Sequence, residues 1–526
     1  MPRPIQLVTA VLGACGLILF FGAAHSEVNP TFTDADNNSS GDRTHDLRHN
    51  AVVPPPGSQK TLGWLPSNWY GNNEQQKVVQ HVTDNVAADD DLYMSFHNGV
   101  PQTTLTSGIA GFNFFTNLYL FNGTFYFVTD DAEAAGFPAQ GPGYIMSDVS
   151  GATKETAGPD RWQVITPAEA KQVLGRMAIR RHGVSHYFND RDGGGSQAFL
   201  AHYYHFSAHF PVLFAFFSAT IALDIAVGEM FIGLWRLSAS AGSYELPARL
   251  VFLSEGAEWR DRARITPWFQ RTIMAETVIE EHPDWEDRKL SGVTFVYDKI
   301  GIADRWAAHR HGTLEVKHWN KAIGDLPQLR VPLNWMDPLR DRVVQVSEVS
   351  GCTAKRAQPT VPVVTYIDRQ KTARRLLPDC HEDLVKSLQA LHDNGDIEFV
   401  HAQMEFIERT EQFCLAARTD IMVGVHGNGL SHQLWMKPGS GVLEIMMPDS
   451  FLRDYSILAE LMSHEYYAVH NDTYLPRDKW RRPDGWGIGA NDDFHSSKIP
   501  ANGPWIANLV KDMAARRRYG PTPVQW

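Results

Sequence analysis

The stretch DIMVGVHGNGLSHQLWMKPGSGVLEIMMP at residues 420–448 sets the fold of the second half of the chain. It begins with a short apolar run, typical of a buried strand, that ends at His426. A turn with Gly427 and Gly429 follows, then a mostly apolar segment, and residues 441–445 form a second strand-like run. The sequence predicts strand, glycine turn, helix and strand, the unit from which parallel sheets are built.

The same alternation of predicted strands and helices is found upstream of this stretch. The β-branched run PVVTYI at residues 362–367 and the run IEFV at 397–400 predict two more strands. Residues 381–391 and 405–417 have helical spacing of apolar side chains. Strands and helices that alternate at these lengths predict an α/β fold with a parallel, doubly wound sheet.

Polar residues gather where these predicted strands end. Arg369 follows the run at 362–367, His426 ends the next buried run, and Glu444 lies near the end of the last. Ligands of such sheets bind at the carboxyl ends of the strands, so we expect these residues to share a site.

The residue types at this edge suit a sugar diphosphate. Glycine lets a phosphate approach backbone amides at the start of a helix, and His426 could donate to a phosphate oxygen. A tight turn alone would explain the glycines but not His426 and Asn428. Arg369 could grip a diphosphate bidentately, as could Arg374 or Arg375 beyond it. Glu444 could hold ribose hydroxyls, or act in a cap or a salt bridge.

The first half of the chain is aromatic and irregular. Strand-like runs at 118–121 and 124–128 flank Asn122-Gly123, which is a strong hairpin signal. A capping box formed by Thr166 and Glu169 predicts a helix over residues 166–180.

The composition limits the class of protein. The 526 residues carry 48 Lys+Arg and 60 Asp+Glu, a net charge of −12, which argues against a general binder of nucleic-acid phosphates. A hydrophobic fraction of 43% can build more than one core. The four cysteines are too few for a disulfide scaffold, and beyond Cys15 they allow either one pair with a free thiol or inert buried thiols.

The N-terminus predicts a secretory location. Residues 5–24 have no ionisable side chain and are long enough for a membrane anchor or a signal peptide. The polar, proline-containing residues that follow predict a flexible stem. We expect a signal segment at 1–28, a stem at 29–60, lobes at 61–338 and 339–490, and a tail at 491–526 that packs back on the body. This layout is typical of a lumenal enzyme of the endoplasmic reticulum or Golgi, either membrane-anchored or secreted.

Metal chemistry has weaker signals. His202, His205 and Glu229 could form the centre of a metal-dependent hydrolase, but the spacing is permissive and no cysteine pair supports it. Asp-x-Asp patterns occur at residues 34–36, 89–91 and 190–192, and in so acidic a chain each is expected to be a solvated loop.

The quoted stretch resembles the signature of glycosyltransferase family 61: a strand, His-Gly-x-Gly-Leu, a Pro-Gly turn and an apolar strand that contains glutamate. Weaker matches to the family lie at residues 117–128, 202–206, 259–261 and 364–375. The resemblance implies a GT-B architecture, with two Rossmann-like lobes, and inverting transfer of a sugar from a UDP-sugar co-substrate. It implies no tightly bound cofactor and no required metal.

Carried onto this chain, the resemblance places His426, Gly427, Asn428 and Gly429 along the diphosphate. Arg369 would offset its charge and Glu444 would meet the ribose. Glu229, or failing that His205, is the candidate base. The donor sugar would be GlcNAc or xylose, and the acceptor a hydroxyl of a glycoprotein or polysaccharide. The alternative is a non-catalytic lumenal protein that binds glycans or acts as a scaffold.

One departure from the family lies near residues 207–227, which are almost wholly apolar and separate the His-Tyr-Tyr-His-Phe block from Glu229. We interpret them as an insertion that arose from an intron read as coding sequence. If they are genuine, they could move Glu229 away from the site and leave an inactive member. Transcript sequencing across this junction distinguishes the two.

Overall fold

The computed structural model describes residues 92–148, 157–190, 230–254, 259–260, 264–313, 323–480 and 498–526. Residues 5–24, the stem, the apolar stretch at 207–227, and the candidate side chains of His202, His205 and Glu229 lie outside these residues. In the described part, no helix combines the length and apolar character that crossing a membrane requires.

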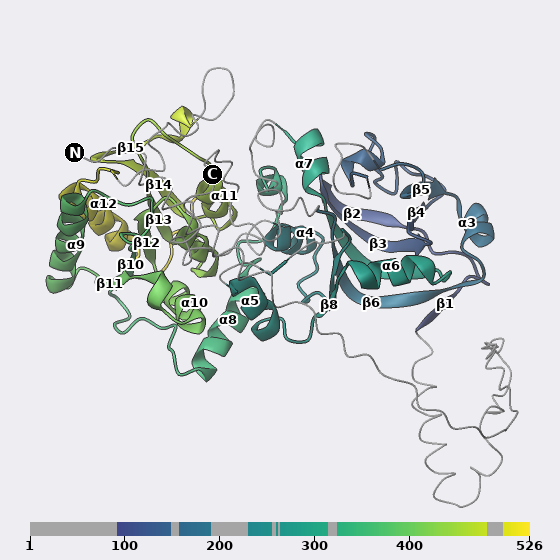
Figure 1. Ribbon diagram of the computed structural model, residues 1–526, viewed down its shortest axis with the longest axis horizontal. Coiled ribbons are helices and arrows are strands. Elements are labelled where there is room, and N and C mark those ends of the chain that lie inside the picture. Colours follow the sequence, from purple (N-terminus) through teal and green to yellow (C-terminus); the bar gives the residue numbers. More distant parts are fainter. Residues whose placement is uncertain are drawn as a thin grey trace, which may run out of the picture. The chain divides into compact units, whose positions relative to one another are not determined.

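The chain builds a mixed α/β structure with two sheets, each carrying its own helices (Figure 1). The first sheet has nine strands, in the order β5-β4-β3-β9-β6-β7-β8, with β1 beside β6 and β2 beside β3. Its strands are β1 (Tyr93–Ser95), β2 (Thr104–Ile109), β3 (Phe112–Phe121), β4 (Thr124–Val128), β5 (Trp162–Ile165), β6 (Met177–Phe188), β7 (Arg249–Phe252), β8 (Val278–Glu280) and β9 (Phe295–Ala303).

This first sheet mixes both strand directions. Strands β6, β7, β8 and β9 run parallel to their neighbours among themselves, whereas β3 pairs antiparallel with β2, β4 and β9. The predicted hairpin is confirmed, because Phe121 pairs with Thr124 across Asn122 and Gly123, both at positive φ. The sheet is thus only partly of the parallel, Rossmann-like kind expected for this half.

Helices cover the first sheet on both faces. Helix α4 (Ile232–Ser240) packs on the face that includes Phe112 and Phe188, and α6 (His282–Leu290) contributes Trp285 to the cluster on the other face. The remaining helices of this half are α3 (Pro167–Val173), α5 (Ile265–Thr272) and α7 (Arg305–His311), with the short 3-10 helices η2 (Pro142–Tyr144) and η7 (Leu326–Gln328).

Helix α3 begins as predicted and ends early. Thr166 accepts from the Glu169 amide, and the Glu169 carboxylate accepts from the Thr166 amide at 2.8 Å, so the capping box is confirmed. The predicted extent to residue 180 is wrong, because the helix ends at Val173 and β6 starts at Met177. Residues 177–180 pair with β1 and β9 instead, and these ladder bonds outweigh the local helical preference.

The second sheet has six strands in the order β11-β10-β12-β13-β14-β15, all parallel except β15. The strands are β10 (Val363–Ile367), β11 (Glu398–Ala402), β12 (Ile421–Val425), β13 (Gly441–Ile445), β14 (Glu465–His470) and β15 (Thr473–Leu475). The doubly wound parallel sheet predicted for this half is confirmed. Because the chain moves from β10 outward to β11 and then back past β10 to β12, the strand order reverses beside β10.

Alternate residues of these strands point to two helical layers. Val364 and Tyr366 pack with α9 (Pro378–Asp393) and α12 (Gly503–Arg516), whereas Ile367 and Met422 pack on the opposite face. That face is covered by α10 (Arg409–Arg418), the 3-10 helix η9 (Asn428–Trp435) and α11 (Asp454–Leu461). The expected helix at 405–417 begins later than predicted, at Arg409, after the 3-10 turn η8 (Met404–Phe406).

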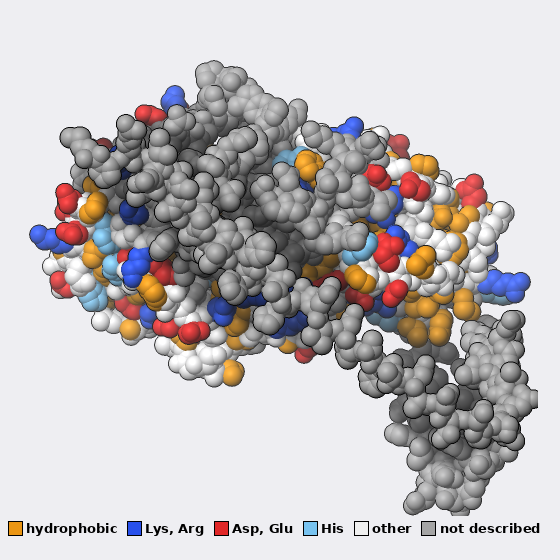
Figure 2. Space-filling model, in the orientation of Figure 1, with side chains coloured by type: hydrophobic (Ala, Val, Ile, Leu, Met, Phe, Trp, Pro, Cys, Tyr) orange, Lys and Arg blue, Asp and Glu red, His pale blue; other side chains and the backbone are white. Residues whose placement is uncertain are grey.

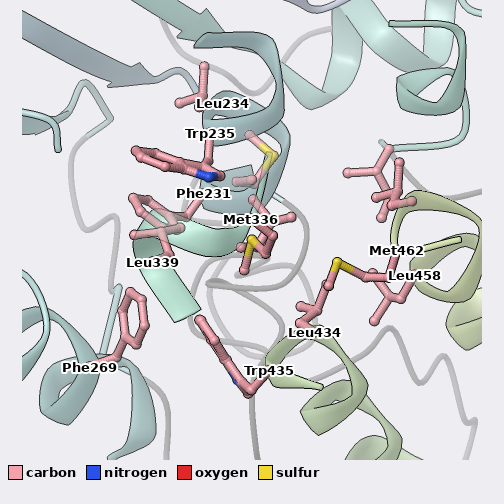
Figure 3. Close-up of a cluster of buried hydrophobic side chains, with 14 of the residues drawn as sticks. Phe231, Leu234, Trp235, Phe269, Met336, Leu339, Leu434, Trp435, Leu458 and Met462 are labelled. Carbon is pink, nitrogen blue, oxygen red and sulfur yellow. The ribbon is translucent and has the colours of Figure 1, made fainter. Parts of the chain in front are cut away.

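One hydrophobic cluster contains side chains from both halves of the chain (Figure 3). Trp235 of α4, Met336 and Leu339 meet Trp435 of η9 and Leu458 of α11 in this cluster. Leu339 belongs to α8 (Asp337–Val349), the helix that precedes the second sheet.

Buried polar bonds reinforce this cluster. The Arg236 guanidinium donates to the carbonyls of Leu326, Leu329 and Leu461, and the indole of Trp335 also donates to Leu461. The Gly-x-Trp-Arg segment at residues 233–236 therefore belongs to the structural core.

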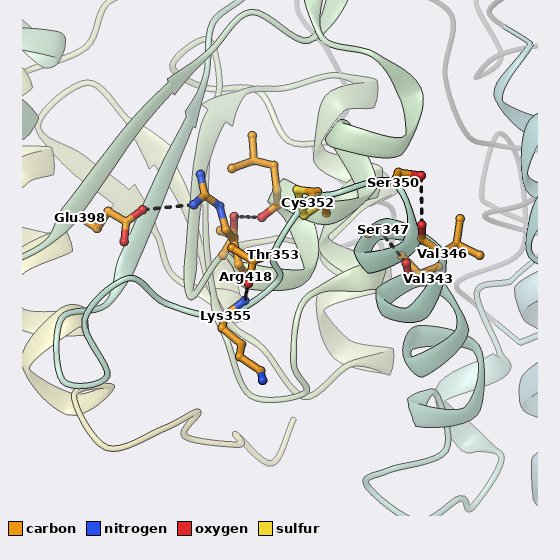
Figure 4. The surroundings of a disulfide bond; sticks show 12 residues. Val343, Val346, Ser347, Ser350, Cys352, Thr353, Lys355, Glu398 and Arg418 are labelled. Carbon is orange, nitrogen blue, oxygen red and sulfur yellow. Dashed lines mark hydrogen bonds and ion pairs between the residues drawn. A yellow bond between two sulfur atoms is a disulfide. The ribbon is translucent and has the colours of Figure 1, made fainter.

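A disulfide joins Cys352 to Cys414, and Cys380 is a free thiol (Figure 4). Of the two possibilities left by the sequence, the structure has one pair and a free cysteine. The bond ties the segment after α8 to α10, on the face of the second sheet that carries the cluster of Figure 3.

Candidate functional site

Three of the predicted residues lie together at the carboxyl edge of the second sheet. Arg369 follows β10, His426 follows β12, and Glu444 is the fourth residue of β13. The backbone amide of His426 donates to Ile445 at 2.9 Å, which continues the β12–β13 ladder to this point. The neighbouring ends of β10 and β12 form the topological switch point, where doubly wound sheets bind their ligands.

Arg369 lies against the glycine turn. Its Nη1 donates to the carbonyl of His426 at 3.1 Å, and its Nε lies 3.4 Å from the Thr372 hydroxyl. A Cβ on Gly427 would stand 1.2 Å from Nη1, at a φ of +150° that side chains rarely adopt. Glycine is required here because the guanidinium occupies the space of a side chain. The structure thus brings an arginine cation into contact with a glycine backbone.

Asn428 opens the 3-10 helix η9 and is fully buried. Its Oδ1 lies 3.5 Å from both the Ser431 and the Tyr455 hydroxyls. Within the described residues, its Nδ2 has no hydrogen-bond partner. Leaving a buried amide donor unsatisfied costs about 1–3 kcal/mol, so this donor is suited to an incoming acceptor. Gly429 follows and packs closely on Ile367, so that a Cβ there would lie 2.8 Å from its side chain.

His426 lies between two acidic side chains. Its Nδ1 is hydrogen-bonded to the Glu444 carboxyl group, and its Nε2 lies 3.6 Å from Asp454 Oδ2. The ring edge packs on Tyr455, with ring centroids 5.2 Å apart. All of these side chains are buried, so the imidazole has a fixed orientation.

Glu444 is held inside the protein on both of its oxygens. Oε1 meets His426, and Oε2 accepts from the Tyr466 hydroxyl at 2.6 Å. Burial raises the pKa of Glu444 well above its usual range, and the bond from Tyr466 opposes that rise. Both oxygens are engaged and the side chain is fully buried, so a ribose hydroxyl would compete with these contacts, which orient His426.

Arg374 and Arg375 follow in the loop after β10. Arg375 donates to the Thr372 carbonyl at 2.9 Å, and the charge of Arg374 opposes the rise that burial causes in the pKa of Glu444. The sequence named Arg374 and Arg375 as further candidates for a phosphate contact, and both lie in the loop that begins with Arg369.

Sequence reasoning missed Asp454 and Tyr466, which come from α11 and β14. Tyr466 pairs with Val442 on the neighbouring strand β13, but only the register of the sheet reveals that neighbourhood. A polar residue at the first position of α11 was the available signal for Asp454.

Sequence reasoning also missed a cluster of three side chains, Asp368, His381 and His401. Their possible ligand atoms all lie within 4.8 Å of one another. Burial raises the pKa of Asp368, but hydrogen bonds from His401, Gln403 and the Gln370 amide outweigh it and hold that pKa well below its usual range.

The Asp-x-Asp prediction needs a correction in the first sheet. Asp190 is fully buried and pairs with Arg305 at 3.0 Å, so it is not part of a solvated loop as expected. It follows β6, and Asp304 and Arg305 follow the adjacent parallel strand β9. Acidic and basic side chains are intermixed on the described part of the face shown in Figure 2.

Comparisons with known proteins bear on this edge of the sheet. Residues 203–443 match the model of the family Glycosyltransferase 61, a range that contains Arg369 and His426 and ends one residue before Glu444. A relative from Drosophila melanogaster, named EGF domain-specific O-linked N-acetylglucosamine transferase, is 28% identical over 123 residues. That alignment covers 23% of this chain and 22% of the relative, so the chain matches only about a fifth of the relative's length.

Proposed function

We propose that the chain, whose residues 203–443 match the model of glycosyltransferase family 61, is a member of that family and transfers a sugar from a UDP-sugar to a hydroxyl group of a glycoprotein or glycan. The observation that carries the proposal is the position of Arg369 against the Gly427 turn at the switch point of the parallel sheet. A cation, a glycine backbone and the unpartnered donor of Asn428 meet there, as a diphosphate requires.

Arg369 would stabilise the departing UDP. In a direct displacement, the acceptor oxygen attacks the anomeric carbon while the bond to the diphosphate breaks, and negative charge grows on the diphosphate oxygens. A guanidinium already fixed by the His426 carbonyl can meet that charge without reorganising. The backbone amides of Gly427, Asn428 and Gly429 would add donors, because the first amides of a helix lack partners within it.

His426 and Glu444 have different proposed roles. Glu444 holds the His426 ring by Nδ1, and we propose that Nε2, which lies 3.6 Å from Asp454, donates to a phosphate oxygen of bound UDP without a change of ring orientation. The ribose contact predicted for Glu444 stays a prediction, and it would compete with the bond from Tyr466.

The acceptor hydroxyl needs a general base. Glu229 is the proposed base and His205 the alternative; both lie outside the described residues. Transfer with inversion, a GT-B arrangement of two lobes and a lumenal location are parts of the same proposal, supported by the family match and by the apolar residues at 5–24. UDP-GlcNAc is the first donor to try because of the name of the relative, and UDP-xylose is the second.

The test is turnover of UDP-GlcNAc and UDP-xylose by the full chain with glycoprotein acceptors, without added metal. Arg369→Ala should lower the rate by about 10²–10³-fold, the usual cost of a lost charge-stabilising donor. Arg418→Ala is the matched control, since Arg418 pairs with Glu398 at 3.3 Å on the surface of the same sheet and should leave the rate unchanged. Folded Arg369→Ala protein with parental turnover and UDP affinity would refute the assignment.

A further inference from the structure

Asp368, His381 and His401 meet beside the sugar-nucleotide edge without taking part in it. Asp368 is the first residue after β10, His401 lies in β11, and His381 lies in the first turns of α9. The His401 Nε2 lies 3.0 Å from Asp368 Oδ2, and the ligand atoms of all three side chains fall within 4.8 Å of one another. Three different elements thus bring two imidazoles and a carboxylate to one point.

The group is separate from the proposed UDP site. Asp368 contacts His401 and Gln403 on the β11 side, whereas Arg369 contacts the His426 carbonyl on the β12 side. Consecutive residues of an extended chain point in opposite directions, which explains the division.

The surroundings of the group resemble the outer shell of a metal centre. The Tyr366 hydroxyl is 3.0 Å from Nδ1 of His381, and Gln403 donates to the Asp368 carboxylate at 2.8 Å. Partners of this kind fix the orientation of ligating imidazoles and carboxylates. The Tyr366 ring also stacks on His401, with centroids 5.5 Å apart, which restricts that ring as well.

We propose that Asp368, His381 and His401 form a binding site for a divalent transition metal of the Zn²⁺ class. Two neutral imidazoles and one carboxylate suit Zn²⁺, which leaves a fourth position for water. Ligands of a tetrahedral zinc ion stand about 3.3 Å apart, so small side-chain movements complete the site. The Asp368 side chain is 2% exposed and that of His401 is 33% exposed, so solvent reaches the group on the His401 side. The bound metal would fasten α9 to the ends of β10 and β11.

The test is titration of the metal-stripped full chain, prepared without a histidine tag, with Zn²⁺ by calorimetry and with Co²⁺ by visible absorption. One equivalent should bind, and Co²⁺ should give the d–d absorption of a site with nitrogen ligands. His401→Ala and His381→Ala should each weaken Zn²⁺ binding at least about tenfold, since even loss of an outer-shell partner costs 10–100-fold. Unchanged melting temperatures of the metal-free variants would confirm that they fold.

His182→Ala is the matched control. His182 forms an equivalent pair with Asp298 at 3.0 Å in the first sheet, but no three-ligand group includes it among the described residues. Its substitution should leave Zn²⁺ affinity unchanged. No stoichiometric binding by the parental chain would overturn the proposal, as would loss of binding in His202→Ala or His205→Ala while His401→Ala still binds. Neither result depends on sugar transfer or on UDP binding.

Discussion

The two sheets both end their parallel strands in buried polar groups, and the two groups differ in what they leave unpaired. In the first sheet, Asn189 and Asp190 follow β6, and Asp304 and Arg305 follow β9. In the second sheet, Arg369, the turn at His426 and Asn428, and Glu444 lie at the corresponding edge. The same topological rule places polar residues at both edges.

Most bonds of the first group are made among its own members and Ser147. Asp304 Oδ2 accepts from the Ser147 amide and hydroxyl and from Asn189, and Arg305 pairs with Asp190. Among the described residues, one buried atom of this group without a hydrogen-bond partner is an acceptor, Asn189 Oδ1. The second group instead leaves a donor, Asn428 Nδ2, beside an arginine and a glycine turn. The buried carboxylates of the first edge and the free donor of the second together favour the second edge as the place for an anion.

The largest expected effect comes from breaking the first group. Arg305→Ala removes a cation that pairs with the fully buried Asp190 and should lower the free energy of unfolding by about 3–5 kcal/mol. Denaturant titration measures this loss. UDP affinity measured well below the lowered melting temperature should equal that of the parental chain, and a large loss of UDP affinity in a folded variant would show that the two groups are not distinct.

The second largest effect is expected from removing the disulfide, which lies in the second half of the chain. Replacing both Cys352 and Cys414 by serine opens a loop with a sequence separation of 62 residues and should cost about 2–4 kcal/mol of stability. Denaturant titration of the double variant checks this, and Cys380→Ser is the control because that thiol is free. A double variant as stable as the parental chain would contradict the structural role of this bond.

Buried histidines in both halves predict acid sensitivity. Burial lowers the pKa of His186 in the first sheet to about 3 and that of His432 in the second half to about 4. Because both values lie below the unfolded value of about 6.5, the unfolded chain binds protons first as the pH falls. The stability that depends on these two neutral histidines is therefore fully present above pH ~6.5 and is lost as the pH falls toward 4.

The variant His186→Gln measures how much of this acid sensitivity comes from the histidine of the first sheet. Gln can keep the hydrogen bond to Ser238, which now lies 3.0 Å from the His186 ring nitrogen, and it does not titrate. The loss of unfolding free energy between pH 7 and pH 5 should shrink by about 2 kcal/mol in this variant. An unchanged pH dependence would mean that His186 does not stay neutral in the native state.

The smallest expected effect is that of Tyr466→Phe. It removes the hydroxyl that donates to Glu444 at 2.6 Å and should cost about 1–2 kcal/mol of stability. If Glu444 only orients His426, UDP affinity should change little, whereas a tighter grip on UDP would favour the ribose contact, since the competing bond is gone. Calorimetry with UDP and with inorganic pyrophosphate, which has no ribose, distinguishes these two roles of Glu444.

Four of the six strands of the second sheet, β10 to β13, could be predicted from the sequence because each is a short, mostly apolar run, whereas β14 and β15 were not predicted. The predicted strand at residues 441–445 coincides with β13, and the edge rule brought Arg369, His426 and Glu444 together. Asp454 and Tyr466 could not be predicted from the sequence because they contact the site only through tertiary packing.

The first sheet could not be read in the same way. Strand β6 contains Arg180, Arg181 and His182, and its register with β9 shifts between Arg181 and Val184. Gly183 lies at this irregularity with φ +72°, so the alternation that signals a strand is interrupted. The capping box predicted a helix that ran on to residue 180, but long-range pairing with β1 and β9 makes residues 177–180 a strand.

The measurement that tests the central claim most directly is binding of UDP and UDP-sugars to the full chain, by thermal shift and calorimetry, with and without Mn²⁺. Ligand at 100 times its dissociation constant should add about 2.7 kcal/mol of stability. We expect UDP and one UDP-sugar to stabilise the parental chain without added metal, GDP-sugar to fail, and Arg369→Ala to lose the effect. Absence of stabilisation by any uridine nucleotide, or stabilisation that persists in Arg369→Ala, would contradict the account.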